Sequence, residues 1–163
     1  MKPLFISSII LLTNCAVAGA ANKPQNVAQD VTYCELAKSP SAFSGKRIRV
    51  RAIYSYMFEV SRLKPPACCA EGDVAVWVDF REEMDGNSKR LFHKFPKGMG
   101  FVLATFEGVF QSGGPFGDGG YRFKLAVDKI EAVENKANPS PAHRPAWIPN
   151  CEAPSAVSRG NKG

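Results

Sequence analysis

The sequence predicts a mainly β protein: a small, partly open barrel of about five strands, with a short N-terminal helix and a disordered C-terminal tail. Three observations support this prediction. Several segments alternate apolar and polar residues, glycine-rich stretches separate them, and a helix-capping motif precedes the first strand. All of these lie within about one hundred residues, which suits a single small barrel. A two-sheet sandwich is the second candidate.

The chain of 163 residues begins with the pattern of a secretory signal peptide. Lys2 precedes an apolar run that ends at Leu12, and small-residue cleavage sites follow as far as Ala20. The run is shorter than the roughly 20 apolar residues that a membrane-spanning helix needs. We therefore predict a signal peptide over 1–20, a linker over 21–30, and a periplasmic or secreted protein with no transmembrane segment.

Lipidation of Cys15 is an alternative fate for the leader. The run Leu12-Thr13-Asn14-Cys15 has the outline of a bacterial lipobox, in which the cysteine becomes the acylated first residue. Asn14 stands where such motifs take Gly, Ala or Ser, and ordinary cleavage sites follow it. We therefore favour cleavage over a lipid anchor.

A short helix is predicted ahead of the first strand. Thr32 and Glu35 fit a capping box, in which the threonine hydroxyl accepts from a helical amide and the glutamate reaches back to the cap amide. Pro40 begins a second turn, because proline is tolerated at a first helical position, and Gly45 ends it.

The clearest predicted strand covers residues 47–58. An apolar face alternates there with a basic face that carries Arg47, Arg49 and Arg51. Ile53 breaks the alternation, which suggests a bulge, or a bend where one strand serves two halves of a sheet. A long, irregular first strand suits an OB-type barrel. The predicted inward set is Ile48, Val50, Ala52, Tyr54, Tyr56 and Phe58.

Three further strands are predicted over 74–80, 101–110 and 121–133, with a short edge strand over 89–95. The glycine-rich stretch 113–120 does not open a helix after a strand, so it is predicted as a hairpin loop and not as a phosphate cradle. The inward sets are Val74, Val76, Val78 and Phe80, then Val102, Ala104, Phe106 and Phe110, then Tyr121, Phe123, Leu125, Val127 and Ile130.

The barrel domain is predicted to cover residues 31–134, and residues 135–163 form a Pro-rich, largely disordered tail. Prolines recur in this tail among Asn, Ser and Ala, with few apolar residues to bury. Trp147 and Ile148 are exceptions that would attach the tail locally to the barrel, and Cys151 would lock it there.

The cysteines are the strongest chemical signal in the chain. Once Cys15 leaves with the leader, an even number remains in an oxidising compartment, which predicts disulfides. The four are Cys34, Cys68, Cys69 and Cys151. A bond between Cys68 and Cys69 would close a strained ring. We therefore favour one of that pair bonding Cys34 and the other bonding Cys151, with the choice between the two open.

Enzyme and metal-site motifs are nearly absent. His93 lies in a basic loop and His143 in the tail, and neither context suggests a base that activates a nucleophile. Adjacent thiols near His93 would suit copper(I), but structural metal sites space their ligands by two to four residues. The acidic stretch 82–85 fits a solvated turn. The sequence therefore predicts no enzyme, no catalytic residues, no metal and no cofactor.

One set of residues supports a binding function. The arginine face (Arg47, Arg49 and Arg51) is followed by a basic loop region that includes Lys94 and Lys97. OB-type barrels bind ligands through such a face and its flanking loops, with aromatic side chains as platforms. The flanking candidates are Lys89, Arg90, Phe92, Phe95 and Phe116. Alternatively, the arginines form only the solvated side of a strand and protect its edge from aggregation.

Several short motifs carry a resemblance to a known group. They are Val31-Thr32-x-Cys34-Glu35-Leu36, Pro40, Phe43, Gly45-Lys46, Ile48-x-Val50-x-Ala52, Trp77-Val78 and Phe106-Glu107-Gly108-x-Phe110. Over about residues 31–133 the chain resembles uncharacterised exported bacterial proteins with an OB-like β-barrel. The resemblance implies the fold and the export. It implies no activity, because no activity is established for that family.

These observations predict an exported, non-enzymatic binding module of the periplasm or cell envelope, whose ligand or protein partner is unidentified. The formal net charge of +6 is small for a nucleic-acid binder, and export further argues against that ligand. One alternative is a structural or interaction protein that acts through its basic, Pro-rich tail. The other is a secreted hydrolase, which would need His93 beside a serine, threonine or carboxylate in a cleft.

Overall fold

The computed structural model describes residues 27–58, 60–69, 74–118, 120–138 and 145–149. The predictions for the signal peptide, for Cys15, for His143 and for Cys151 fall outside these residues. So does most of the tail that the sequence predicts to be disordered.

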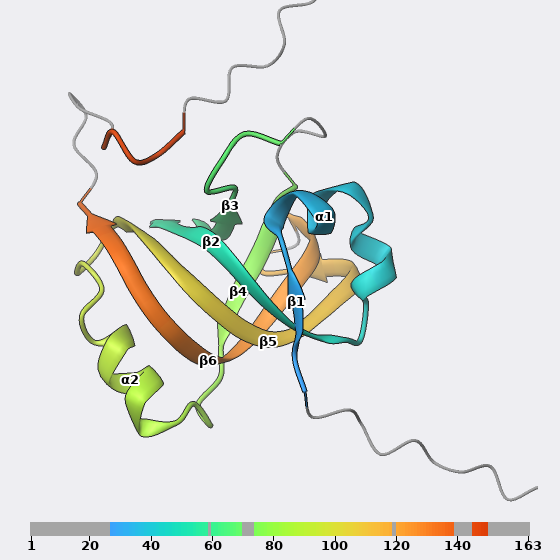
Figure 1. The fold of residues 1–163 in the computed structure, drawn as a ribbon, viewed down its shortest axis with the longest axis horizontal. Helices are drawn as coiled ribbons and strands as arrows, with labels where there is room; N and C mark the ends of the chain where they lie inside the picture. Colours follow the sequence, from blue (N-terminus) through green and yellow to red (C-terminus); the bar gives the residue numbers. More distant parts are fainter. Residues whose placement is uncertain (1–26, 59, 70–73, 119, 139–144, 150–163) are drawn as a thin grey trace, which may run out of the picture.

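Six strands form one mixed sheet, and the strands close into a ring (Figure 1). The strand order is β1-β2-β3-β4-β6-β5, and an additional pairing of β5 with β2 closes the ring. This confirms the mainly β class that the sequence predicts. The strands are β1 (Gln29–Val31), β2 (Arg47–Met57), β3 (Val60–Lys64), β4 (Val76–Phe80), β5 (Gly100–Phe116) and β6 (Tyr121–Ala137).

The strand β2 pairs along both of its edges. One edge pairs with β5 in antiparallel register from Arg47 to Tyr56. The other edge pairs in parallel with β1 as far as Val50, and then in antiparallel register with β3 from Ile53 onward. The register of β2 runs through Ile53 without a shift, so the bulge suggested there is wrong.

Ile53 is apolar on the outer side of β2 because another part of the chain covers it. Ile53 and its β5 partner Leu103 form a buried cluster with Ile148, against which Phe101 and Trp147 pack. The segment Trp147–Ile148 therefore attaches to the barrel, as the sequence suggested. The irregular pairing lies elsewhere, between β5 and β6, where the register shifts several times.

The interior of the ring is filled by alternate residues of the strands, as the period-two pattern predicts. Phe58 and Tyr121 are exceptions. β2 ends at Met57, and Phe58 lies in the following turn with a positive φ of 50° and 93% of its surface exposed. Tyr121 is only partly buried and its ring contacts Trp77. The buried positions that were predicted to face inward are Ile48, Val50, Ala52, Tyr54, Val76, Val78, Val102, Ala104, Phe106, Phe110, Leu125, Val127 and Ile130.

The helix α1 (Tyr33–Lys38) begins with the predicted capping box. The Glu35 amide donates to the Thr32 hydroxyl at 3.2 Å, and the Thr32 amide donates to the Glu35 carboxylate at 2.8 Å. Tyr33 and Leu36 are buried against the barrel, and a 3-10 turn over Pro40–Phe43 follows. These contacts fix the start of α1 beside β1.

The edge strand predicted over 89–95 is wrong, because α2 (Gly86–Phe92) occupies most of this segment. The Asp85 carboxylate caps the helix by accepting from the Ser88 amide at 2.7 Å. The buried Ser88 hydroxyl accepts from the Ile130 amide at 2.9 Å, which attaches α2 to β6. Apolar residues at 91, 92 and 95 also fit helical spacing, so alternation alone could not decide between strand and helix.

Several element boundaries also differ from the predictions. The short strand β1 lies partly in the predicted linker 21–30, and β3 was not predicted. The strand β6 continues to Ala137, past the predicted start of the tail at Asn135. No helix within the described residues is long and apolar enough to cross a membrane.

Candidate functional site

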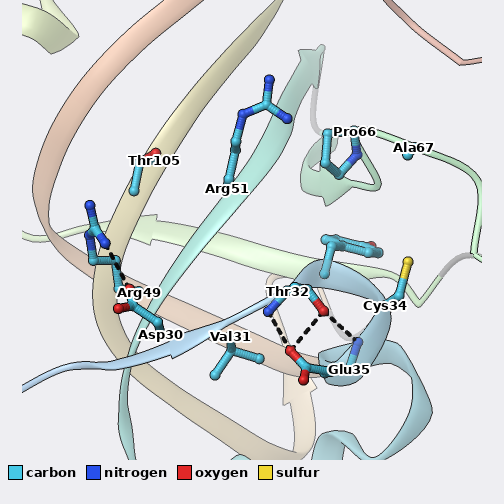
Figure 2. A pocket seen from close by; sticks show the side chains of 11 residues that line it. Asp30, Val31, Thr32, Cys34, Glu35, Arg49, Arg51, Pro66, Ala67 and Thr105 are labelled. Carbon is cyan, nitrogen blue, oxygen red and sulfur yellow. Dashed lines mark hydrogen bonds and ion pairs between the residues drawn. The ribbon is translucent and has the colours of Figure 1, made fainter.

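A groove of about 530 Å³ lies beside the start of α1 (Figure 2). We call it the α1 groove. Its walls are the β1–α1 segment on one side and the loop between β3 and β4 on the other, and its floor comes from β2 and β5. The lining residues include Asp30, Val31, Arg49, Arg51, Pro66, Ala67 and Thr105.

A disulfide joins the two walls of the groove. Cys34 in α1 bonds Cys69 in the β3–β4 loop, with a Cα–Cα distance of 5.3 Å. The sequence predicted that Cys34 bonds one of the adjacent pair, and the structure selects Cys69. Cys68 is itself disulfide-bonded, while the predicted partner Cys151 lies outside the described residues.

A second contact ties the same walls together. The Tyr33 hydroxyl donates to the Val74 carbonyl at 2.6 Å, at the far end of the β3–β4 loop. Because Tyr33 and Cys34 are adjacent, one turn of α1 holds this loop at two points. The spacing of the walls is therefore set by the fold before any ligand enters.

The groove lies where the edge of β2 changes neighbour. The parallel pairing with β1 ends at Val50, and the antiparallel pairing with β3 begins at Ile53. Neither β1 nor β3 pairs with Arg51, which leaves room for a groove at this point of the sheet. In Figure 2, Arg51 lies between Thr105 on one side and Pro66 on the other.

The three arginines of the arginine face are all paired with carboxylates. Arg47 donates to Glu107 at 2.8 Å and, through both terminal nitrogens, to the two oxygens of Asp128 at 2.7 Å. Arg51 donates to both oxygens of Glu134, at 2.6 and 2.5 Å. This bidentate geometry is the strongest form of a guanidinium–carboxylate contact.

Arg49 lies between two carboxylates, Asp30 of β1 at 2.7 Å and Glu131 of β6. Lys129 adds a further cation, which bonds Glu131 and Glu107. Four cations therefore alternate with five carboxylates across four strands, and the surface predicted to be basic is nearly balanced in charge. The sequence prediction missed these acidic partners.

The pKa shifts on this surface all favour the charged forms at neutral pH. Hydrogen bonds from Lys129 and Arg49 lower the pKa of Glu131, and the bond from Arg51 lowers that of Glu134. The bonds of Arg49 to Asp30 and Glu131 raise the pKa of its guanidinium. A general acid or base needs a pKa near the working pH. The electrostatics here instead suit ion pairing and binding.

These shifts predict a loss of stability in acid. A carboxylate whose pKa is lowered by folding contributes its stability above the ordinary value of 4.5, and loses it as the pH falls through the lowered value. Glu134→Gln removes a carboxylate of a partly exposed pair. We expect the free energy of unfolding of this variant to fall less in acid than that of the wild type, by up to about 1 kcal/mol. Thermal unfolding between about pH 6 and pH 3 measures it. Glu82→Gln, an exposed residue outside the network, is the control, and an equal acid response in both variants would contradict the assignment.

Arg49 and Arg51 keep donors for a ligand despite their ion pairs. Their side chains are 43% and 51% exposed. Among the described residues, Nη2 of Arg49 and Nη1 of Arg51 have no acceptor. The floor of the α1 groove thus carries two oriented guanidinium groups, each with an unused N–H group.

The remaining predicted binding residues do not line the groove. Arg47 lies by a second pocket that Asp128 and Lys129 also line. Lys94 and Lys97 are exposed in the loop after α2. The residues predicted as one binding face therefore lie at separate places, and of the predicted set only Arg49 and Arg51 line the α1 groove.

His93 caps the C-terminal end of α2 and is exposed. Its side chain forms no hydrogen bond within the described part of the chain. Over the same residues, no group of three or more His, Cys, Asp or Glu side chains is placed to hold a metal ion.

Comparisons with protein-family models, with curated proteins and with solved structures find no match for this chain. The resemblance to exported OB-like proteins therefore stays a prediction. The class that the structure defines is a mainly β protein with a ring-closed mixed sheet and a disulfide-bridged groove on its outer side.

Proposed function

We propose that this chain is an exported, non-enzymatic binding module of the periplasm or cell envelope, with its ligand site in the α1 groove. The observation that carries the proposal is the combination of two walls joined by the Cys34–Cys69 disulfide with a floor that presents the unused N–H groups of Arg49 and Arg51.

We further propose that the ring is an OB-type barrel. Leaving aside β1, five strands close the ring, and the long strand β2 pairs along both edges, with β5 on one and β3 on the other. A first strand that contributes to both halves of the sheet is the feature that suggested this fold from the sequence. OB-type barrels commonly bind ligands on an outer face with flanking loops.

The size and rigidity of the groove support a small ligand. Its volume of about 530 Å³ lies within the range usual for small-molecule sites. Because the disulfide fixes the walls before the ligand binds, the protein loses less conformational entropy on binding. The same disulfide is compatible with an oxidising compartment, which supports the periplasmic or secreted location.

The chemistry of the groove supports a ligand with an oxygen acceptor and an apolar body. The unused N–H of Arg51 and the Thr105 hydroxyl, contributed by paired residues of β2 and β5, provide polar contacts. Val31, Pro66 and Ala67 provide apolar wall. The carboxylates on this surface offset the charge of the arginines, so a polyanion gains little electrostatic attraction here. A small carboxylate or a similar hydrogen-bond acceptor fits better.

The test compares Arg51→Ala with Arg81→Ala. Arg81 is a matched control, because its side chain is 49% exposed, is paired with one glutamate and does not line the groove. The purified protein is incubated with the small-molecule fraction of an envelope extract, and native mass spectrometry measures the retained ligand. We expect Arg51→Ala to lose at least about tenfold in retention, with stability changed by no more than about 1 kcal/mol. Equal retention by both variants would remove the groove as the binding site.

A further inference from the structure

A second surface lies at the end of the barrel where β2 and β6 end and β5 begins (Figure 1). Tyr56 pairs with Gly100, and its hydroxyl donates to the Pro96 carbonyl, so the turn after β2 adjoins the loop after α2. We call this surface the basic end. Its members are Phe58, Phe92, Lys94, Lys97 and Lys136.

The basic end exposes large apolar side chains. Phe58 is 93% exposed and has a positive φ of 50°, a conformation that bulky residues rarely adopt. Phe92 is partly exposed, although its ring also contacts Phe80 and Phe95. Nothing within the described residues buries Phe58. A phenylalanine held at the tip of a turn in this way is suited to insert into an apolar environment outside the protein.

The cations of the basic end differ from those of the arginine face. Lys94, Lys97 and Lys136 form no ion pair with any described carboxylate, and the Lys136 ammonium donates only to the Lys94 carbonyl. That contact brings the end of β6 onto the loop after α2. Lys89 and Arg90 add exposed positive charge on α2. The charges of Lys94, Lys97 and Lys136 therefore face solvent without an ion pair to a described acidic group, whereas Glu83 partly offsets Lys89.

We propose that the basic end docks on an anionic phospholipid surface, with Phe58 entering the interfacial layer and the lysines lying over the headgroups. Exposed aromatic residues beside lysines are the composition that binds such interfaces. Each lysine near an anionic membrane adds attraction, and the apolar anchor supplies the second signal that stable attachment needs. A free phosphate would use the lysines and leave Phe58 without a role. This surface is separate from the α1 groove.

The test measures cosedimentation of the purified protein with vesicles of phosphatidylglycerol mixed with phosphatidylcholine, and with vesicles of phosphatidylcholine alone. We expect binding to the anionic vesicles only, weakening as salt is raised. Replacing Lys94 and Lys97 by glutamine should lower partitioning about fivefold for each cation removed. Phe58→Ser should lower it about tenfold.

One control keeps the result interpretable. Lys38→Gln removes an exposed lysine of α1, away from this surface, and should bind as the wild type does. No residue of the basic end lines the α1 groove, so failure of the groove proposal leaves this one standing. Equal binding to neutral vesicles, no binding to either kind, or unchanged partitioning of the Phe58→Ser variant would each overturn the proposal. Phe58-dependent capture of a protein, with no vesicle binding, would overturn it as well.

Discussion

Replacing Gly108 by alanine is expected to destabilise the barrel by more than about 4 kcal/mol. Gly108 lies in β5 at a register shift, where β6 approaches closely. A Cβ there would lie 2.1 Å from the Ala126 carbonyl oxygen and 2.8 Å from its carbon. Backbone atoms of a paired strand cannot move aside as a flexible side chain can, so the ring must open or shift. Thermal or denaturant unfolding followed by circular dichroism measures the loss.

Gly86→Ala is the matched control for this substitution. Gly86 is the first residue of α2, has no atom within 4 Å of the position of a Cβ, and does not adopt a positive φ. Alanine should be neutral or slightly stabilising there, because it reduces the freedom of the unfolded chain. If Gly108→Ala unfolds at the same temperature as Gly86→Ala, the close approach of β6 to β5 is not as described.

The second large effect is expected from removing the Cys34–Cys69 disulfide. The two cysteines are 35 residues apart, so the bridge restricts a long loop of the unfolded chain and contributes about 4 kcal/mol in the chain-entropy model. We expect the Cys34→Ser, Cys69→Ser double variant to unfold at a correspondingly lower denaturant concentration. It should also bind more weakly in the groove, because only the Tyr33–Val74 hydrogen bond of the two contacts described above still joins the walls.

Mass mapping of proteolytic peptides, with and without reductant, checks the pairing itself. A peptide that links residue 34 to residue 69 is expected, and it should be absent from the double variant. A link from Cys34 to Cys68, with wild-type stability in the double variant, would contradict the assignment. Tyr33→Phe is a useful companion, since it removes the hydrogen bond to Val74 while leaving the disulfide in place.

The fold was predictable where local pattern and tertiary environment agree. Alternation identified the inward residues of β2, β5 and β6, because one face of each strand meets the interior of the ring. It failed at Ile53, whose outer face is covered by Ile148 from a distant part of the chain. It failed again around α2, where the Asp85 cap and the contact of Ser88 with β6 decide for a helix.

The candidate site was predictable only in part, for a related reason. The sequence singled out Arg49 and Arg51, but their acidic partners Glu131 and Glu134 are more than 80 residues away. Glu131 and Glu134 are three residues apart in the sequence, so strict alternation would place them on opposite faces of β6. A register shift between β5 and β6 at each glutamate lets both reach the arginine face, which strand alternation does not anticipate. Likewise, two adjacent cysteines are equivalent in a sequence, and only the position of α1 against the β3–β4 loop selects Cys69.

The two-edged pairing of β2 has a consequence for folding. Its hairpin partner β3 follows within a few residues, but β5 lies some fifty residues further along the chain, since Ala52 pairs with Ala104. Until β5 pairs with β2, one edge of β2 has unpaired backbone N–H and C=O groups, to which a strand of another copy could bind. Three like charges along that strand repel a second copy until they meet their carboxylates, of which β1 supplies Asp30, β5 supplies Glu107 and β6 supplies the rest. In the folded barrel the same arginines join β2 to β1, β5 and β6 through their ion pairs.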